Sequence, residues 1–82
     1  MNVQILFFAQ LRDVAGSGSL NVELNGSATV ADLIESLSSN QALHDALQDL
    51  SLMVSVNQQI SDRSKILKSG DEVGFLPPVS GG

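Results

Sequence analysis

The feature that most constrains the fold of this chain is the spacing of its apolar residues, which changes twice along the sequence. Residues 3–8, VQILFF, alternate, so that Val3, Ile5 and Phe7 share one face of an expected strand. Leu6 and Phe8 share the other face. From residue 30 the apolar positions recur at helical spacing, and from residue 52 they alternate again. This order predicts a sheet with a helix packed across one face.

Two shorter signals complete the amino-terminal half. The stretch AQLRDVAG, residues 9–16, predicts a helical turn that ends at Gly16. Residues 20–24, LNVEL, alternate and predict a second strand, and Asn25 and Gly26 predict the turn after it.

Two helices are predicted in the middle of the chain. Thr29 and Asp32 have the spacing of a capping box, which marks the start of the main helix. The apolar residues that follow lie on one helical face: Val30, Leu33, Ile34 and Leu37. After a polar break, the same spacing predicts a second, shorter helix at Leu43, Ala46, Leu47 and Leu50.

The carboxyl-terminal half returns to strands. Residues 52–56 alternate, with Leu52, Val54 and Val56 on one face. A last strand is predicted over residues 72–76, EVGFL. Pairing should stop at Pro77 and Pro78, because proline has no N–H to donate to a ladder.

The polar segment 61–72, SDRSKILKSGDE, reads as a loop. We expect Ile66 and Leu67 to anchor it and residues 69–71 to form a turn. Its cationic side chains are expected on a solvated face: Arg63, Lys65 and Lys68.

A right-handed crossover would place the last strand parallel to the first. The expected fold is therefore α+β, a β-grasp or ubiquitin-like fold: a mixed sheet packed on one main helix, with a short second helix and a flexible C-terminal Gly-Gly tail. Residues 1–78 would form the domain and residues 79–82 the extended tail. A ferredoxin-like sandwich is the alternative, but it needs another helix near residues 61–71, whose sequence is a poor helix.

Composition narrows the function. The 82 residues contain no cysteine, and a net charge of −5 disfavours nucleic acid or an anionic membrane as partner and favours a basic protein surface. The single histidine, His44, is expected to face solvent and has no second nitrogen ligand nearby, so no metal site is predicted. The first ten residues lack the pattern of a signal peptide, which predicts a cytoplasmic protein.

The strand alternation also predicts an interface. If Val73 and Phe75 face the core, Leu76 points outward, and so does Phe8. With Ile60 they could form an exposed apolar patch, which usually marks an interface. The alternative is that a loop or the second helix covers it.

The tail is narrow and chemically simple. Val79, Ser80, Gly81 and Gly82 can extend at most ~14 Å, and two glycines without Cβ atoms can pass through a tight channel. A terminal carboxylate is a poor electrophile, so it would need activation, most simply as an acyl-adenylate. The alternative is a poorly ordered terminus without a function.

The segments FFAQLRDVAG, residues 7–16, and GDEVGFLPPVSGG, residues 70–82, resemble the sulfur-carrier small subunits of molybdopterin synthase. The similarity spans the whole chain. Carriers of the thiazole pathway and ubiquitin-like modifiers also end in Gly-Gly, but do not usually carry this opening. Family members often have an aromatic residue where this chain has Leu76, so the docking surface is altered but stays apolar.

The resemblance implies a reaction cycle. A ubiquitin-activating-like adenylyltransferase would use ATP to adenylate Gly82, and a sulfur donor would convert it to a thiocarboxylate. The tail would then enter the large synthase subunit and donate sulfur to cyclic pyranopterin monophosphate, in a complex of two small and two large subunits. This chain would be a non-catalytic, sulfur-donating subunit that binds no cofactor itself.

The resemblance also implies residue roles. Gly82 would carry the adenylate and the thiocarboxylate, and Gly81 would keep the passage narrow. Partner contacts are assigned to these positions: Phe8, Arg12, Ile60, Leu76, Pro77, Pro78, Val79 and Ser80. For Arg12, a surface salt bridge is the alternative.

Two other functions stay open: a related sulfur carrier or protein modifier, which would form an isopeptide bond to a lysine, and a ubiquitin-like interaction module without carrier chemistry.

Overall fold

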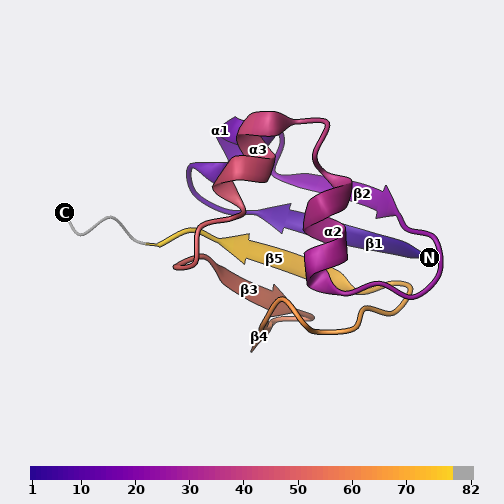
Figure 1. Ribbon diagram of the computed structural model, residues 1–82. Helices are drawn as coiled ribbons and strands as arrows, with labels where there is room; N and C mark the ends of the chain where they lie inside the picture. Colours follow the sequence, from indigo (N-terminus) through magenta and orange to yellow (C-terminus); the bar gives the residue numbers. More distant parts are fainter. Residues whose placement is uncertain (79–82) are drawn as a thin grey trace.

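The structure is a computed structural model that describes residues 1–78, with three helices and five strands in that range (Figure 1). The strands are β1 (Asn2–Phe7), β2 (Ser19–Glu23), β3 (Met53–Val56), β4 (Gln59–Ser61) and β5 (Glu72–Leu76). The helices are α1 (Leu11–Ala15), α2 (Val30–Ser36) and α3 (Gln41–Ala46).

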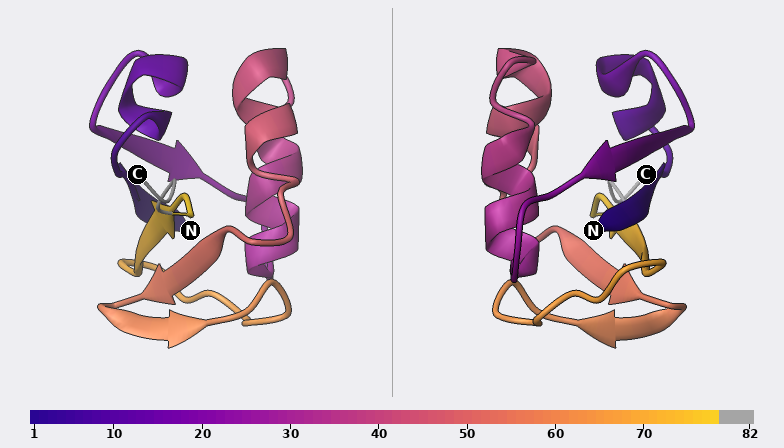
Figure 2. Two further views of the ribbon diagram at one scale, coloured as in Figure 1. Left: turned by 90° about the vertical axis from the view of Figure 1, so that its left-hand side faces the viewer. Right: turned by 90° about the vertical axis from the view of Figure 1, so that its right-hand side faces the viewer.

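The strands form one mixed sheet in the order β2-β1-β5-β3-β4. The central pair, β1 and β5, is parallel, and the other neighbours are antiparallel. Figure 2 shows α2 and α3 stacked along one face of this sheet. The predicted β-grasp fold is confirmed, and the ferredoxin-like alternative is wrong because residues 62–71 contain no helix.

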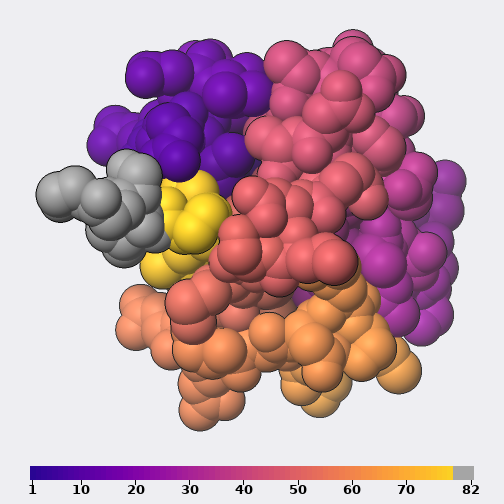
Figure 3. Space-filling view, turned by 60° about the vertical axis from the view of Figure 1, so that its left-hand side comes forward, coloured from indigo at the N-terminus to yellow at the C-terminus, as the bar shows by residue number. Residues whose placement is uncertain are grey.

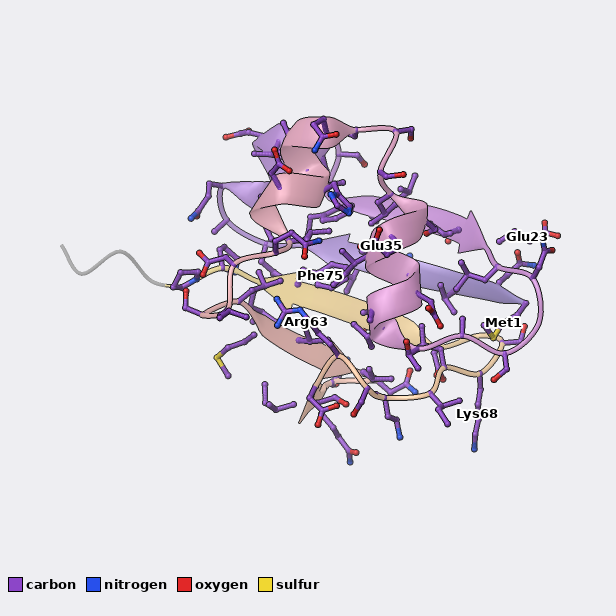
Figure 4. All side chains as sticks on the ribbon, in the orientation of Figure 1. Met1, Glu23, Glu35, Arg63, Lys68 and Phe75 are labelled. Atoms are coloured by element: carbon purple, nitrogen blue, oxygen red, sulfur yellow. The ribbon has the colours of Figure 1, made fainter. Side chains whose placement is uncertain are left out.

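The core lies between the sheet and the helices. Val3, Ile5 and Phe7 of β1 are buried, as are Val73 and Phe75 of β5. The Phe7 and Phe75 rings stack with centroids 6.3 Å apart, and Figure 4 labels Phe75 on β5. The inward alternation predicted for both strands is therefore confirmed.

The start of α2 is fixed by the predicted capping box. The Thr29 Oγ1 atom accepts from the Asp32 N–H at 3.2 Å, and Asp32 Oδ2 accepts from the Thr29 N–H at 2.9 Å. The four apolar residues predicted on its inner face are all buried: Val30, Leu33, Ile34 and Leu37.

The loop between β4 and β5 is tied to this helix start. The N–H groups of Val30 and Ala31 donate to the carbonyls of Lys65 and Arg63. These donors belong to the first helical turn and have no partner within the helix. The loop thus closes one end of the core.

Two predicted core residues are exposed. Leu50 is 91% exposed, because α3 ends at Ala46 and the helical spacing does not continue to residue 50. Ile66 is 61% exposed while Leu67 is buried, since neighbouring residues of an extended segment face opposite sides. Of the two apolar residues, Leu67 is the one whose side chain packs in the core.

Arg63 was expected on a solvated face, and that prediction is wrong. The residue is half-buried, and its guanidinium donates to the carbonyls of Leu47 at 3.0 Å and Asp49 at 2.9 Å. These carbonyls follow α3, where backbone acceptors lack helical partners. Arg63 therefore joins the loop after β4 to the end of α3 (Figure 4).

A β-hairpin was missed at residues 56–59. Asn57 and Gln58 connect β3 to β4, and both have positive φ values, 52° and 69°. Two left-handed residues make a tight two-residue hairpin turn, but the usual sequence is Asn-Gly. Here glutamine stands where the usual turn sequence has glycine, so the sequence did not predict this hairpin.

Gly16 ends α1 as predicted, with φ 79° and an N–H that donates to the Arg12 carbonyl. Within residues 1–78, none of the three helices has the length and apolarity needed to cross a membrane.

Candidate functional site

The face of the sheet opposite the helices carries several apolar side chains. The register places Leu6 beside Gly74, Gly74 beside Ser55, and Ser55 beside Ile60. Residues paired in this way project from the same face of a sheet. Leu76 pairs with Met53 in the row nearer the carboxyl end of β5.

We call Leu6, Phe8, Met53, Ile60 and Leu76 the outer patch. Phe8 is 41% exposed, Met53 49% and Ile60 65%, while Leu6 and Leu76 are half-buried. Because α2 and α3 pack on the opposite face, the second helix does not cover this patch (Figure 2). Exposed apolar side chains gathered on one face are typical of an interface.

Gly74 lets the patch pack closely. A Cβ atom at this position would lie 3.3 Å from Phe8 Cε2, 3.8 Å from Leu76 Cδ1 and only 2.5 Å from Ser55 Oγ. The structure thus brings Phe8 and Leu76 together above Gly74. Ile60 shares their face but lies on the edge strand, three strands from β1.

The sequence interpretation missed Met53 as a member of this patch. Its signal was present, since Leu52 and Val54 face inward and the residue between them must face outward. Met53 is well suited to an interface because its flexible thioether adapts to different contact surfaces.

Arg12 lies on α1. Its guanidinium packs beside Gly18, where Nε would be 3.3 Å from a Cβ atom. Within residues 1–78, no carboxylate oxygen lies within 4.0 Å of this guanidinium, so the surface salt bridge considered as an alternative is not formed there. Its role in partner contact stays a prediction.

Pro77 and Pro78 follow β5, and they form one wall of a groove that we call the tail-root groove. Figure 3 shows the yellow end of β5 at the surface between the indigo residues near α1 and the salmon residues after α3. The other lining residues come from α1, from α3 and from the segment that follows α3: Gln10, Leu11, Val14, Asp45, Ala46, Gln48, Asp49 and Leu52.

The two carboxylates of this groove are partly used by neighbours. Asp49 Oδ1 accepts from the Ser51 hydroxyl at 2.7 Å and from the Ser51 N–H at 2.9 Å. These bonds, with a smaller contribution from Arg63, lower the pKa of Asp49, so it is ionised at neutral pH. Asp45 Oδ1 accepts from the Gln41 amide at 2.8 Å.

His44 does not face solvent as expected. Its side chain is only 19% exposed, and its Nε2 lies 3.3 Å from Glu35 Oε1. The contact links α3 to α2, so the structural role of His44 is to join the two helices.

The remaining predicted site residues, Val79, Ser80, Gly81 and Gly82, lie outside the described residues. Their roles stay predictions. Within residues 1–78, no three His, Asp or Glu side chains cluster closely enough to hold a metal ion.

Comparison with known proteins extends over the whole chain. The sequence profile of the ThiS family matches residues 5–82. The molybdopterin synthase sulfur carrier subunit of Escherichia coli K12 is 35% identical over 85 residues, which cover 98% of this chain and 99% of that protein.

Solved structures agree with this similarity. Small archaeal modifier protein 1 from Haloferax volcanii superimposes with a TM-score of 0.82 at 28% identity, over 95% of this chain and 98% of that one. Subunit 1 in the complex of molybdopterin-converting factor subunits 1 and 2 from Helicobacter pylori gives 0.72 at 25% identity, over 100% of both chains.

Proposed function

The chain belongs to the ThiS family and, within it, to the molybdopterin synthase sulfur carrier subunits, and from this membership we propose that Gly82 carries the sulfur atom that the synthase transfers. The observation that carries the proposal is the full-length identity to curated carrier subunits, which reaches from the first strand through the segment PPVSGG.

The carrier cycle begins with activation of a carboxylate. A carboxylate oxygen of Gly82 would attack the α-phosphorus of ATP, and pyrophosphate would leave. A sulfur nucleophile from a donor would then displace AMP from the acyl carbon and leave a thiocarboxylate. The chain contains no cysteine that could compete for the activated acyl group or for the transferred sulfur.

The proposed acceptor is cyclic pyranopterin monophosphate, held by the large subunit. The chain supplies the sulfur, and the large subunit supplies the general acid and base chemistry. We assign the adenylation step to a ubiquitin-activating-like adenylyltransferase.

The outer patch suits the docking step. It lies on an uncovered sheet face, and two of its members, Phe8 and Leu76, adjoin the point where β5 leads into Pro77. A partner that bound the patch would therefore also hold the root of the tail. If the large subunit and the adenylyltransferase both use the patch, their complexes with this chain exclude one another.

A second candidate function is protein modification. The observation that favours it is the similarity to small archaeal modifier protein 1 in fold. A modifier would pass the acyl group of Gly82 to a lysine amine instead of receiving sulfur.

The deciding experiment is the intact mass of the chain after incubation with its adenylyltransferase, ATP and a sulfide source. A carrier gains the difference between one sulfur and one oxygen atom, and a variant without Gly82 does not. The adenylyltransferase must first be shown to be active on a known carrier.

Two other outcomes separate the alternatives. Covalent attachment to lysine-bearing proteins, without the sulfur mass shift, would favour the modifier. An unchanged mass and no attachment would leave an interaction module, and the proposed sulfur transfer would be wrong.

A further inference from the structure

The tail-root groove has an apolar floor and an acidic rim, and nothing in the proposed sulfur transfer requires either. Leu11 and Leu52 are buried in its floor, Val14 and Ala46 are half-buried, and the exposed acidic residues Asp45 and Asp49 complete the lining as its rim. We propose that the groove receives a lysine or arginine side chain of the large subunit when the tail is engaged, an inference that rests on the proposed function.

The groove lies next to the root of the tail. Pro77 and Pro78 form one wall, so the groove begins where the described chain ends. The outer patch lies on the opposite face of the sheet at the same end of β5. A protein that surrounds the tail therefore meets the patch on one side and the groove on the other.

The rim carries hydrogen-bond acceptors that can bind a cation. Asp45 and Asp49 each use Oδ1 within the chain, toward Gln41 and Ser51. Within residues 1–78, the Oδ2 atom of neither carboxylate accepts a hydrogen bond. A guanidinium or ammonium group fits these acceptors, and charge-assisted bonds are the stronger class.

The apolar floor of the groove suits the methylene stem of a lysine or arginine side chain. Lysine and arginine lay their methylene stems on apolar surface while the charged head stays at the polar edge. Val14 and Leu52 supply that surface, and Asp49 lies at its edge. An anionic occupant, including the carboxylate of Gly82 itself, would be repelled by two like charges.

The test compares two variants with equal net charge. D45N/D49N neutralises the rim, and E23Q/D62N neutralises two distant carboxylates, so each changes the net charge from −5 to −3. Asp62 is a close control for Asp49, because its Oδ1 accepts from the hydroxyl and N–H of Ser64 just as Asp49 does from Ser51. Glu23 lies at the far end of the sheet from the groove (Figure 4).

Binding of the full chain to its purified large subunit is measured by calorimetry at two salt concentrations. We expect D45N/D49N to weaken binding about tenfold and to flatten its salt dependence, as loss of an interface charge does. The control pair should stay within about twofold of the original chain, since its charges lie outside the interface. Urea titration of both variants checks that each is folded.

Each other result overturns the inference in a recognisable way. Equal weakening by both pairs would show that only net charge matters. Self-association of the chain that D45N/D49N abolishes would identify a second copy as the occupant. If the original chain does not bind the large subunit at all, the proposed function fails with the inference, whereas normal binding by D45N/D49N removes the inference alone.

Discussion

The Phe8 ring lies over Gly74, close enough that a Cβ atom at position 74 would stand 3.3 Å from Phe8 Cε2. Gly74 does not have positive φ, so the backbone itself accepts other residues. The constraint at this position is space, because the same Cβ would lie 2.5 Å from Ser55 Oγ and the Ser55 side chain would have to move.

Gly74→Ala should therefore destabilise the domain. Overpacking a buried position typically costs about 1–3 kcal/mol in free energy of unfolding, which urea titration measures. Adding Ser55→Ala removes the nearer of the two contacts and should restore part of the loss. If the alanine variant is as stable as the original chain, β3 and β5 can shift without cost to make room for the added Cβ atom.

Phe8→Asp should weaken docking while the fold survives. Large aromatic residues at an interface commonly contribute about 2 kcal/mol or more, so we expect binding to the large subunit to weaken at least ~30-fold. Leu20→Asp is the matched control, because Leu20 is 42% exposed against 41% for Phe8 and pairs with the inward-facing Ile5. If calorimetry shows that both variants bind the large subunit equally weakly, the outer patch is not part of the docking surface.

Arg63→Met should reduce stability, since it removes the donor to the Leu47 carbonyl and leaves the Asp49 carbonyl with the Leu52 N–H alone. Hydrogen bonds that involve a charged group contribute about 1.5–3 kcal/mol, and we expect a loss in that range. Lys65→Met serves as the control and should change stability by less than about 0.5 kcal/mol, as exposed positions do. If both substitutions have the same small effect, Arg63 does not hold the end of α3.

The contribution of Asp71 to stability should depend on pH. Hydrogen bonds from the Asn57 amide and from the Lys68 N–H, with smaller contributions from the Lys65 and Lys68 charges, lower the pKa of Asp71 below its usual 3.8. A carboxyl group whose pKa is lower in the folded than in the unfolded state stabilises the fold at pH values above its unfolded-state pKa. This contribution to the free energy of unfolding is lost as the pH falls through the folded-state pKa.

Asp71→Asn should accordingly be less stable than the original chain at pH 7, and the difference should shrink below about pH 4. Urea titrations from pH 7 down to pH 2.5 give the comparison. A difference that stayed constant over this range would mean that the Asp71 charge is not the stabilising feature.

Sequence reasoning succeeded where the determinants are local. The alternation of β1 and β5 and the capping box at Thr29 each lie within a few residues, and the structure confirms them. The predicted approach of Phe8 and Leu76 also followed from alternation once the two strands were taken as neighbours. The docking role of these residues stays a prediction.

Several errors arose where partners are distant in sequence. Nothing near Arg63 indicates that its guanidinium meets carbonyls 14 and 16 residues earlier. Similarly, the choice between Ile66 and Leu67 depends on which side of the loop faces α2. The tail-root groove joins residues of α1, α3 and the end of β5, so no single window of sequence contains it.

The parallel pairing of β1 and β5 has a mechanical consequence. The amino end of β1 and the carboxyl end of β5 lie at opposite ends of the same ladder, at the centre of the sheet (Figure 1). A force that pulls the two ends of the domain apart would slide these strands along each other and strain all of their hydrogen bonds together, instead of opening them one at a time. An enzyme that pulls on the carboxyl end would therefore move the folded domain as a rigid body before it could unfold it.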